Sequence, residues 1–60
     1  MQLLPVIEKY LRASNTAPTR FGRDAVRDPR FVLDLRNGRE PRRRTEARVL
    51  GYIDRQTRGA

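Results

Sequence analysis

The sequence predicts an all-α protein, a compact four-helix domain that takes up residues 1–60. Apolar residues recur every three or four positions in four separate segments, which is the spacing of helices with one buried face. Proline and glycine stand at the borders of these segments, where helices begin and end. Residues 31–35, FVLDL, could form a strand by composition, but the Asp-Pro before them and the Asn-Gly after them fit a two-turn helix as well.

The first helix is expected from about Leu3 to Ala13. Pro5 stands in its first turn, where a missing backbone N–H costs nothing. Residues 14–16, SNT, are typical of a helix end followed by a turn. The apolar face of this helix consists of Leu3, Leu4, Val6, Ile7, Tyr10 and Leu11.

The second helix is expected to begin at Pro18, because proline suits the first helical position. Thr16 or Ala17 would be its cap, and alanine is a poor one. Two of its apolar residues are small and would let a second helix cross closely. The apolar stripe consists of Phe21, Gly22, Ala25 and Val26.

The third helix is expected from Pro29 to about Arg36. Asp28 is a favoured cap residue, and the proline after it is pre-set for the first helical position. Asn37-Gly38 predicts a left-handed stop. The inward residues are Phe31, Val32 and Leu35, with Phe31 assigned to the core because phenylalanine is usually buried.

A basic loop, residues 37–44 (NGREPRRR), leads into the fourth helix. This helix is expected from about Arg43 to Gln56, with Tyr52 at its edge. Residues 58–60 are expected to be frayed, as chain ends often are. The inward residues are Val49, Leu50 and Ile53.

The charge of the chain points to a polyanionic partner. Lys and Arg number 14 against 7 Asp and Glu, a net charge of +7, and Lys9 is the only lysine. A GC-rich genome would explain the preference for Arg over Lys, but not the net excess. The arginine side chain is a planar fork of donors that suits phosphates and guanine edges. A basic excess of this size in a small domain therefore indicates nucleic acid first.

Other classes of function are not expected. The chain has no Cys and no His, which removes disulfides, the commonest zinc ligands and the usual nucleophile–base pairs. We therefore expect no enzyme activity, metal, cofactor or small-molecule site. No apolar run approaches the ~18 residues of a membrane span, and residues 1–11 lack the basic start of a secretory signal. A cytoplasmic protein without membrane contact is expected.

Several residues follow a spacing that spans most of the chain. They are Phe21-Gly22 and Ala25, then Val32 and Leu35, then Asn37-Gly38, then Pro41 and Thr45, and finally Val49, Leu50 and Ile53. This pattern resembles the lambda-repressor-like helix-turn-helix DNA-binding domain from about Leu3 to Ile53. One departure is Val26, which stands where that family usually has glycine in the turn. A β-branched residue would be strained there, so the second helix is expected to run on to Arg27 or Asp28.

The resemblance implies that the third helix enters the major groove of DNA, with its first residues facing base edges. Arg30 is the first choice for a base contact, because arginine pairs bidentately with guanine; a phosphate contact or a solvated side chain is the alternative. Arg27 is a second candidate. Leu33 should point outward and could meet a thymine methyl group or pack at the helix edge.

Two carboxylates lie among these candidates. Asp28 is interpreted as a cap more than a base reader. Asp34 could accept a hydrogen bond from a cytosine amino group and is kept as a base contact, or it could orient an arginine. Phosphate contacts are implied on both sides of the third helix, although an arginine run is often only a solvated loop. The residues assigned to phosphate are Thr19, Arg20, Asn37, Arg39, Arg42, Arg43 and Arg44.

The leading hypothesis is a small sequence-specific binder of double-stranded DNA, a transcriptional regulator of bacterial or phage type that occupies an operator. A module of this size buries only about 600–1,000 Å² on DNA, so a homodimer reading an inverted repeat is expected. Tyr52, or Val6 and Tyr10, would supply the contact between protomers. The alternatives are a protein-binding modulator with the same fold and a protein that coats nucleic acid without sequence preference.

Overall fold

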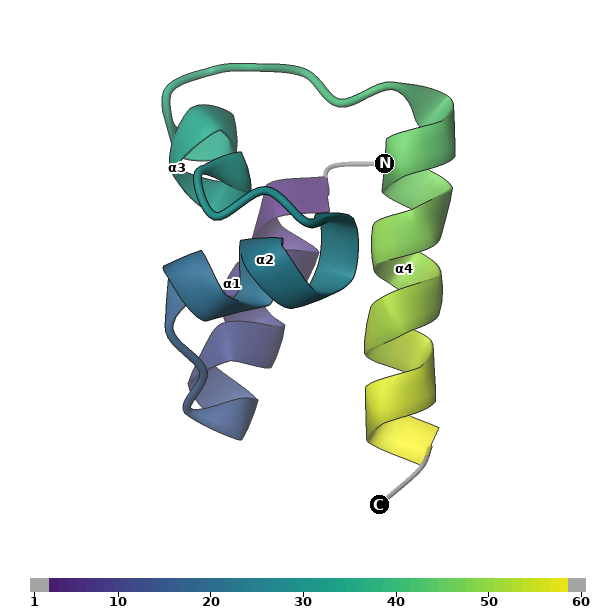
Figure 1. The fold of residues 1–60 in the computed structure, drawn as a ribbon. Coiled ribbons are helices and arrows are strands. Elements are labelled where there is room, and N and C mark those ends of the chain that lie inside the picture. Colours follow the sequence, from purple (N-terminus) through teal and green to yellow (C-terminus); the bar gives the residue numbers. More distant parts are fainter. Residues whose placement is uncertain (1–2, 59–60) are drawn as a thin grey trace.

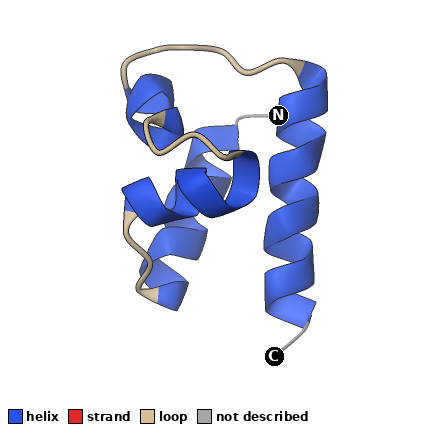
Figure 2. Ribbon diagram, viewed as in Figure 1, coloured by secondary structure: helices blue, strands red, loops and turns tan. Residues whose placement is uncertain are grey.

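The computed structural model describes residues 3–58, and over this range it contains four helices and no strand. They are α1 (Leu3–Ser14), α2 (Pro18–Val26), α3 (Phe31–Arg36) and α4 (Arg43–Arg58). The predicted all-α class is confirmed (Figure 2). Helix α2 packs against both α3 and α4, and α1 packs against α3. A long loop crosses from the end of α3 to the start of α4 on the other side of the molecule (Figure 1).

Each helix contributes one fully enclosed side chain to a shared core. Ile7 of α1, Phe21 of α2, Val32 of α3 and Val49 of α4 are the largest completely buried residues. These positions were all expected to face inward, and so was Phe31, which is also buried. The remaining buried apolar residues are Leu3, Leu11, Ala25 and Leu35.

Three aromatic rings extend the core between α1, α2 and α4. The ring centroid of Phe21 lies 5.5 Å from that of Tyr10 and 5.6 Å from that of Tyr52. The two tyrosine rings meet edge to face at 6.5 Å. Such tilted pairs add to the free energy of folding beyond area burial. Tyr52, expected at the edge of its helix, therefore also serves as a packing residue within the chain.

Helix α1 ends one residue later than predicted, at Ser14, and the expected turn follows. Asn15 takes up a left-handed conformation with φ 55°, which asparagine tolerates better than most residues. The backbone N–H of Thr16 donates to the carbonyl of Leu11 at 3.1 Å and so satisfies one of the free carbonyls at the helix end.

Helix α2 begins at Pro18, as predicted. Ala17 is its cap residue and makes no side-chain cap hydrogen bond. A Cβ atom added to Gly22 would overlap the backbone carbonyl oxygen of Asp28 and lie 3.2 Å from Cβ of Phe31. Glycine is therefore needed here, because the start of the next helical segment passes directly over this point of α2.

The turn between α2 and α3 places its left-handed residue at Arg27. Val26 remains helical, and Arg27 follows as the cap with φ 59° and ψ 31°. The backbone N–H of Arg27 donates to the carbonyl of Arg23 at 3.0 Å. Val26 was correctly excluded from the left-handed position. The expected continuation of the helix to Arg27 or Asp28 is not found, because α2 ends at Val26 and Arg27 is its left-handed cap.

Helix α3 begins two residues later than predicted, at Phe31 instead of Pro29. The correction has a local cause. Asp28 and Phe31 close a tight turn in which the Phe31 N–H donates to the Asp28 carbonyl at 3.1 Å, so Pro29 and Arg30 lie in this turn. The expected helix cap at Asp28 is wrong for the same reason, because the cap residue of α3 is Arg30, without a side-chain cap hydrogen bond. Asp28 instead stabilises the turn before the helix, where its Oδ1 accepts from the Arg30 N–H at 3.0 Å.

The end of α3 follows the prediction, with Gly38 left-handed at φ 98°. Helix α4 begins at Arg43 as predicted but continues to Arg58, beyond the expected end at Gln56. Arg58 was expected to be frayed; instead it lies in α4 and pairs with Asp54 at 3.1 Å. The other two residues expected to be frayed, Gly59 and Ala60, lie outside the described residues.

Candidate nucleic-acid interface

The outward face of α3 and its preceding turn carries three exposed side chains in a row. Leu33 lies within α3, and Arg30 and Asn37 are the residues that flank the helix at its start and end. Their spacing of i, i+3 and i+7 is that of residues on one side of a helix. We call these three residues the α3 ridge. Leu33 is 45% exposed and is the one large hydrophobic side chain so exposed within residues 3–58. The prediction that Leu33 points outward is confirmed.

An ion pair holds one flank of the ridge against α1. Arg36 donates to both carboxylate oxygens of Glu8, from Nε and from Nη2, each at 2.8 Å. These hydrogen bonds lower the pKa of Glu8 and raise that of Arg36. The paired fork geometry fixes the rotation of α3 more firmly than a single contact would.

A second ion pair holds the other flank and joins two residues that were assigned to different contacts. Nη1 of Arg39 lies 3.0 Å from Oδ2 of Asp34. The same two residues are also linked through the backbone, where the Arg39 N–H donates to the Asp34 carbonyl at 3.0 Å. The Asp34 carboxylate thus pairs with an arginine, Arg39, and its contact with a base stays a prediction.

Arg27 stands beside the ridge at the turn that precedes α3. Its side chain is exposed and forms no hydrogen bond or ion pair within residues 3–58. Arg30 is likewise exposed and unpaired by any carboxylate in that range. Both guanidinium groups are free to meet an anion, and the carboxylate of Asp28 between them accepts from the backbone N–H of Arg30.

Of the seven residues assigned to phosphate, Asn37 belongs to the ridge and Arg39 pairs with Asp34. The other five lie in two groups. Thr19 and Arg20 are exposed in the first turn of α2, where Arg20 approaches Asp24 at a loose 3.7 Å. Arg42, Arg43 and Arg44 are exposed at the start of α4. In Figure 1, α2 begins on the same side of the molecule as α3, whereas α4 begins on the opposite side, after the loop has crossed. The sequence could not show this separation.

The start of α4 has an unfavourable charge distribution in the isolated protein. Two arginines open the helix and a third precedes it, and the first turn contains a single acidic residue, Glu46. A helix N-terminus carries a partial positive charge, so cations there are destabilising and anions are stabilising. A phosphate at this end would remove the repulsion.

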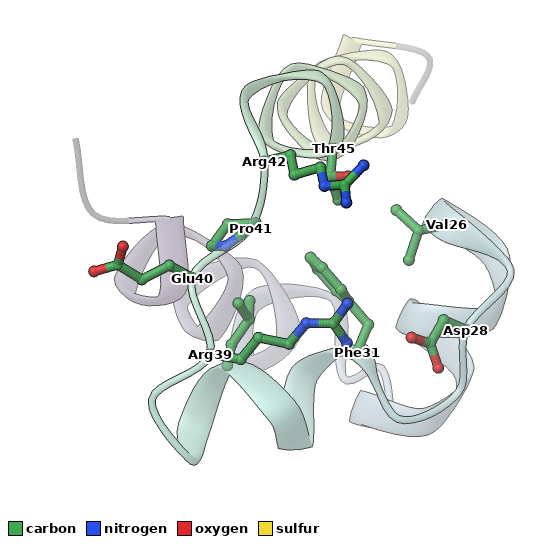
Figure 3. A pocket seen from close by; sticks show the side chains of 9 residues that line it. Val26, Asp28, Phe31, Arg39, Glu40, Pro41, Arg42 and Thr45 are labelled. Atoms are coloured by element: carbon green, nitrogen blue, oxygen red, sulfur yellow. The ribbon is translucent and has the colours of Figure 1, made fainter.

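A hollow that the sequence did not predict lies between the turn before α3 and the start of α4. Its volume is about 470 Å³, and it is lined by apolar side chains below and charged ones at its rim. The guanidinium groups of Arg39 and Arg42 extend into it, and Asp28 stands across from them (Figure 3). The lining has no net charge, because Asp28 and Glu40 balance the charges of the two arginines. The loop residues that form it carry no pattern by which the sequence could reveal it.

Residues 3–58 hold no cluster of acidic, His or Cys side chains suited to a metal ion. None of the four helices has the length and apolar character needed to cross a membrane. A comparison of the chain with protein families, with curated proteins and with solved structures finds no match in any of the three. The site therefore has to be interpreted from its own geometry.

Proposed function

We propose that this chain is a lambda-repressor-like helix-turn-helix protein that binds double-stranded DNA in a sequence-specific way and regulates transcription. The observation that carries the proposal is the α3 ridge, in which an exposed leucine of a short helix stands between an arginine at the start of the helix and an asparagine at its end, at helical spacing. Helix α3 and its turn would enter the major groove with this ridge toward the bases.

The chemistry of the ridge suits base readout. Arg30 can donate two hydrogen bonds to guanine O6 and N7. Asn37, assigned to phosphate from the sequence, is proposed here as a base contact because it shares the ridge with Arg30 and its amide has the geometry that pairs with adenine. Leu33 supplies an apolar surface for a thymine methyl group, which explains why a large hydrophobic side chain is left in solvent. The Arg36–Glu8 and Arg39–Asp34 pairs hold the helix so that the ridge is presented in one orientation.

The remaining arginines supply affinity without sequence information. Thr19 and Arg20 flank the ridge from α2, and positive charge beyond it comes from the following loop and the first two residues of α4, namely Arg39, Arg42, Arg43 and Arg44. Contacts of this kind release counterions from DNA and make the affinity fall steeply with salt. Arg39 contributes its second guanidinium nitrogen, since one nitrogen is held by Asp34.

The proposal includes a homodimer that reads an inverted repeat. A single ridge of three residues contacts too few bases for operator affinity, so two copies are required. Between α1 and α4 lies an apolar hollow of about 220 Å³ that a second copy could fill. Its lining consists of Val6, Lys9, Tyr10, Ala13, Ile53 and Thr57.

The test is capture of sheared genomic DNA on the tagged protein at near-physiological salt, followed by sequencing of the bound fraction. We expect enrichment of a short inverted repeat by the natural chain and none by Arg30→Ala/Leu33→Ala. The matched control is Arg12→Ala, which removes an exposed arginine from α1 and should leave the enrichment intact. Uniform recovery of all sequences, unchanged by the ridge substitutions, would overturn the proposal.

A further inference from the structure

The outer face of α4 carries a line of arginines that the proposed operator contacts leave largely unused. Arg44, Arg48 and Arg55 are exposed and spaced i, i+4 and i+11, which places them along one side of the helix. Ala47 and Gly51 lie between them on the same side. We call these five residues the α4 basic stripe. Arg48 and Arg55 have no part in the contacts proposed above.

Nothing within residues 3–58 neutralises the stripe. None of its arginines forms an ion pair in that range. The two nearby carboxylates are occupied or turned away, since Asp54 pairs with Arg58 and Glu46 is half-buried on another side of α4. Arg44 and Arg48 stand one turn apart, a like-charge spacing that destabilises a helix. A polyanion along this face would remove that repulsion.

The stripe and the α3 ridge face different sides of the molecule. The buried Val49 marks the face of α4 that lies against the core, and α4 packs against α2. Helix α2 in turn packs against α3. The two helices therefore stand at opposite edges of the bundle, with α2 between them (Figure 1). One ligand bound flat against the ridge leaves the stripe open.

We infer that the α4 basic stripe is a second nucleic-acid surface, which binds the phosphate backbone of a duplex without regard to sequence. Arg44 and Arg55 are separated by about 16 Å along the helix axis, at ~1.5 Å per residue, which is enough to follow several phosphates. A Cβ added to Gly51 would touch nothing within 4 Å, so the helix surface there is open to a close approach.

The composition of the stripe favours a nucleic acid over an acidic protein. Protein interfaces depend on buried aromatic or large apolar anchors, and no stripe residue between the arginines is larger than alanine. Interfaces with nucleic acids are instead polar and strongly positive. Arginine is also the side chain best shaped to bind phosphate with two parallel hydrogen bonds.

A molecule with both surfaces would bridge two duplexes. Bridging rests on the proposed function, because one of the two duplexes is held by the α3 ridge. Binding of a duplex to the stripe does not depend on the proposed function. The first experiment below therefore uses DNA of random sequence and a chain in which the ridge is disabled.

The test measures the affinity of a labelled random-sequence duplex by fluorescence anisotropy over a series of salt concentrations. The starting chain is Arg27→Gln/Arg30→Gln, which lacks the two unpaired arginines beside α3. Adding Arg48→Gln/Arg55→Gln should weaken binding at low salt at least tenfold and reduce the slope of log affinity against log salt by about two, at ~0.9 per phosphate contact. Adding Arg12→Gln/Arg23→Gln instead, the same charge change at exposed arginines of α1 and α2, should alter the affinity less than twofold.

Equal weakening by the two pairs of substitutions would overturn the proposal, because it would show only a net-charge effect. A second arm uses labelled poly-glutamate as the probe. If the stripe substitutions weaken binding of poly-glutamate and leave binding of the duplex unchanged, the surface serves an acidic protein and the inference is wrong. Circular dichroism of each variant checks that α4 remains folded, as expected for exchanges at exposed positions.

A bridging assay follows with the natural ridge restored. Two duplexes labelled with a donor and an acceptor should show energy transfer with the natural chain and not with Arg48→Gln/Arg55→Gln. If the stripe binds duplex in the anisotropy test but no energy transfer occurs with the natural chain, the inference about the stripe is supported and the proposed operator contact of the ridge is wrong. The two ideas are thus separable.

Discussion

The backbone N–H of Asp28 donates to the carbonyl of Gly22 at 3.1 Å, and the Asp28 carbonyl lies where a side chain at position 22 would begin. This contact sets how closely the start of α3 approaches α2. It also places Asp28, whose carboxylate caps the turn that carries Arg30. The position of the α3 ridge therefore depends on a glycine in the middle of α2.

Gly22→Ala should destabilise the fold by roughly 1–3 kcal/mol, because the added methyl group forces the turn away from α2. The measurement is the free energy of unfolding from urea titration. Gly51→Ala is the matched control, since nothing lies within 4 Å of its added Cβ. Alanine there should stabilise α4 by up to about 1 kcal/mol. Equal effects at the two glycines would contradict the account of the α2–α3 contact.

Arg27→Gly should stabilise the fold and weaken DNA binding. Arg27 has φ 59°, a conformation that costs a non-glycine residue about 1–2 kcal/mol, and glycine's greater freedom in the unfolded chain offsets part of that gain. Its side chain forms no ion pair within residues 3–58 that would compensate. Thermal unfolding and DNA affinity are measured on the same samples.

The control for Arg27→Gly is Asn15→Gly, which changes the other left-handed non-glycine residue within the described range. Asparagine already tolerates this conformation, so the gain in stability should be smaller and DNA affinity unchanged. A loss of stability in Arg27→Gly would show that the arginine side chain supports the fold.

Leu33→Ala should leave the free energy of unfolding within about 0.5 kcal/mol of the natural value, as for most surface exchanges, and should lower DNA affinity. Val32→Ala, at the fully buried neighbour, should destabilise the fold by roughly 2 kcal/mol through lost burial and a cavity. Chemical denaturation and a binding titration distinguish the two. If Leu33→Ala destabilised as much as Val32→Ala, the leucine would belong to the core.

The Glu8–Arg36 pair should make stability depend on pH in the acidic range. The hydrogen bonds from Arg36 hold the pKa of Glu8 below its value in the unfolded chain. The pair therefore adds stability above the unfolded pKa of about 4.3, and this contribution disappears as the pH falls through the folded pKa.

Glu8→Gln should accordingly flatten the dependence of the melting temperature on pH between about 5 and 3. Glu46→Gln is the control, because Glu46 forms no ion pair within residues 3–58. Identical acid sensitivity in the natural chain and in Glu8→Gln would show that the pair contributes nothing to folding.

Much of the fold could be predicted from the sequence, because helix borders are local events. Pro18, Gly38 and the inward positions of each helix follow from backbone preferences and apolar spacing, and the outward Leu33 follows by elimination. The start of α3 could not be placed, since whether Pro29 opens a helix or a turn depends on how closely the chain passes Gly22. That distance is set by the packing of α2 against the turn before α3, which local sequence preferences do not determine.

The candidate site could be predicted in composition but not in arrangement. The arginines were identified as a group, but their pairing depends on which helices meet. The sequence contains no sign that Glu8 and Arg36, 28 positions apart, would join. It also could not show that the arginines at the start of α4 lie across the molecule from α2, because the path of the loop decides this.

The central claim is that the α3 ridge reads base sequence, and selection from a pool of randomised duplexes tests it most directly. The natural chain should enrich an inverted repeat, and Arg30→Ala should relax the preference at one base pair of each half-site by about 1–3 kcal/mol while keeping the others. If the natural chain recovers all sequences alike, or if Arg30→Ala weakens every sequence equally, the ridge does not read bases and the claim is wrong.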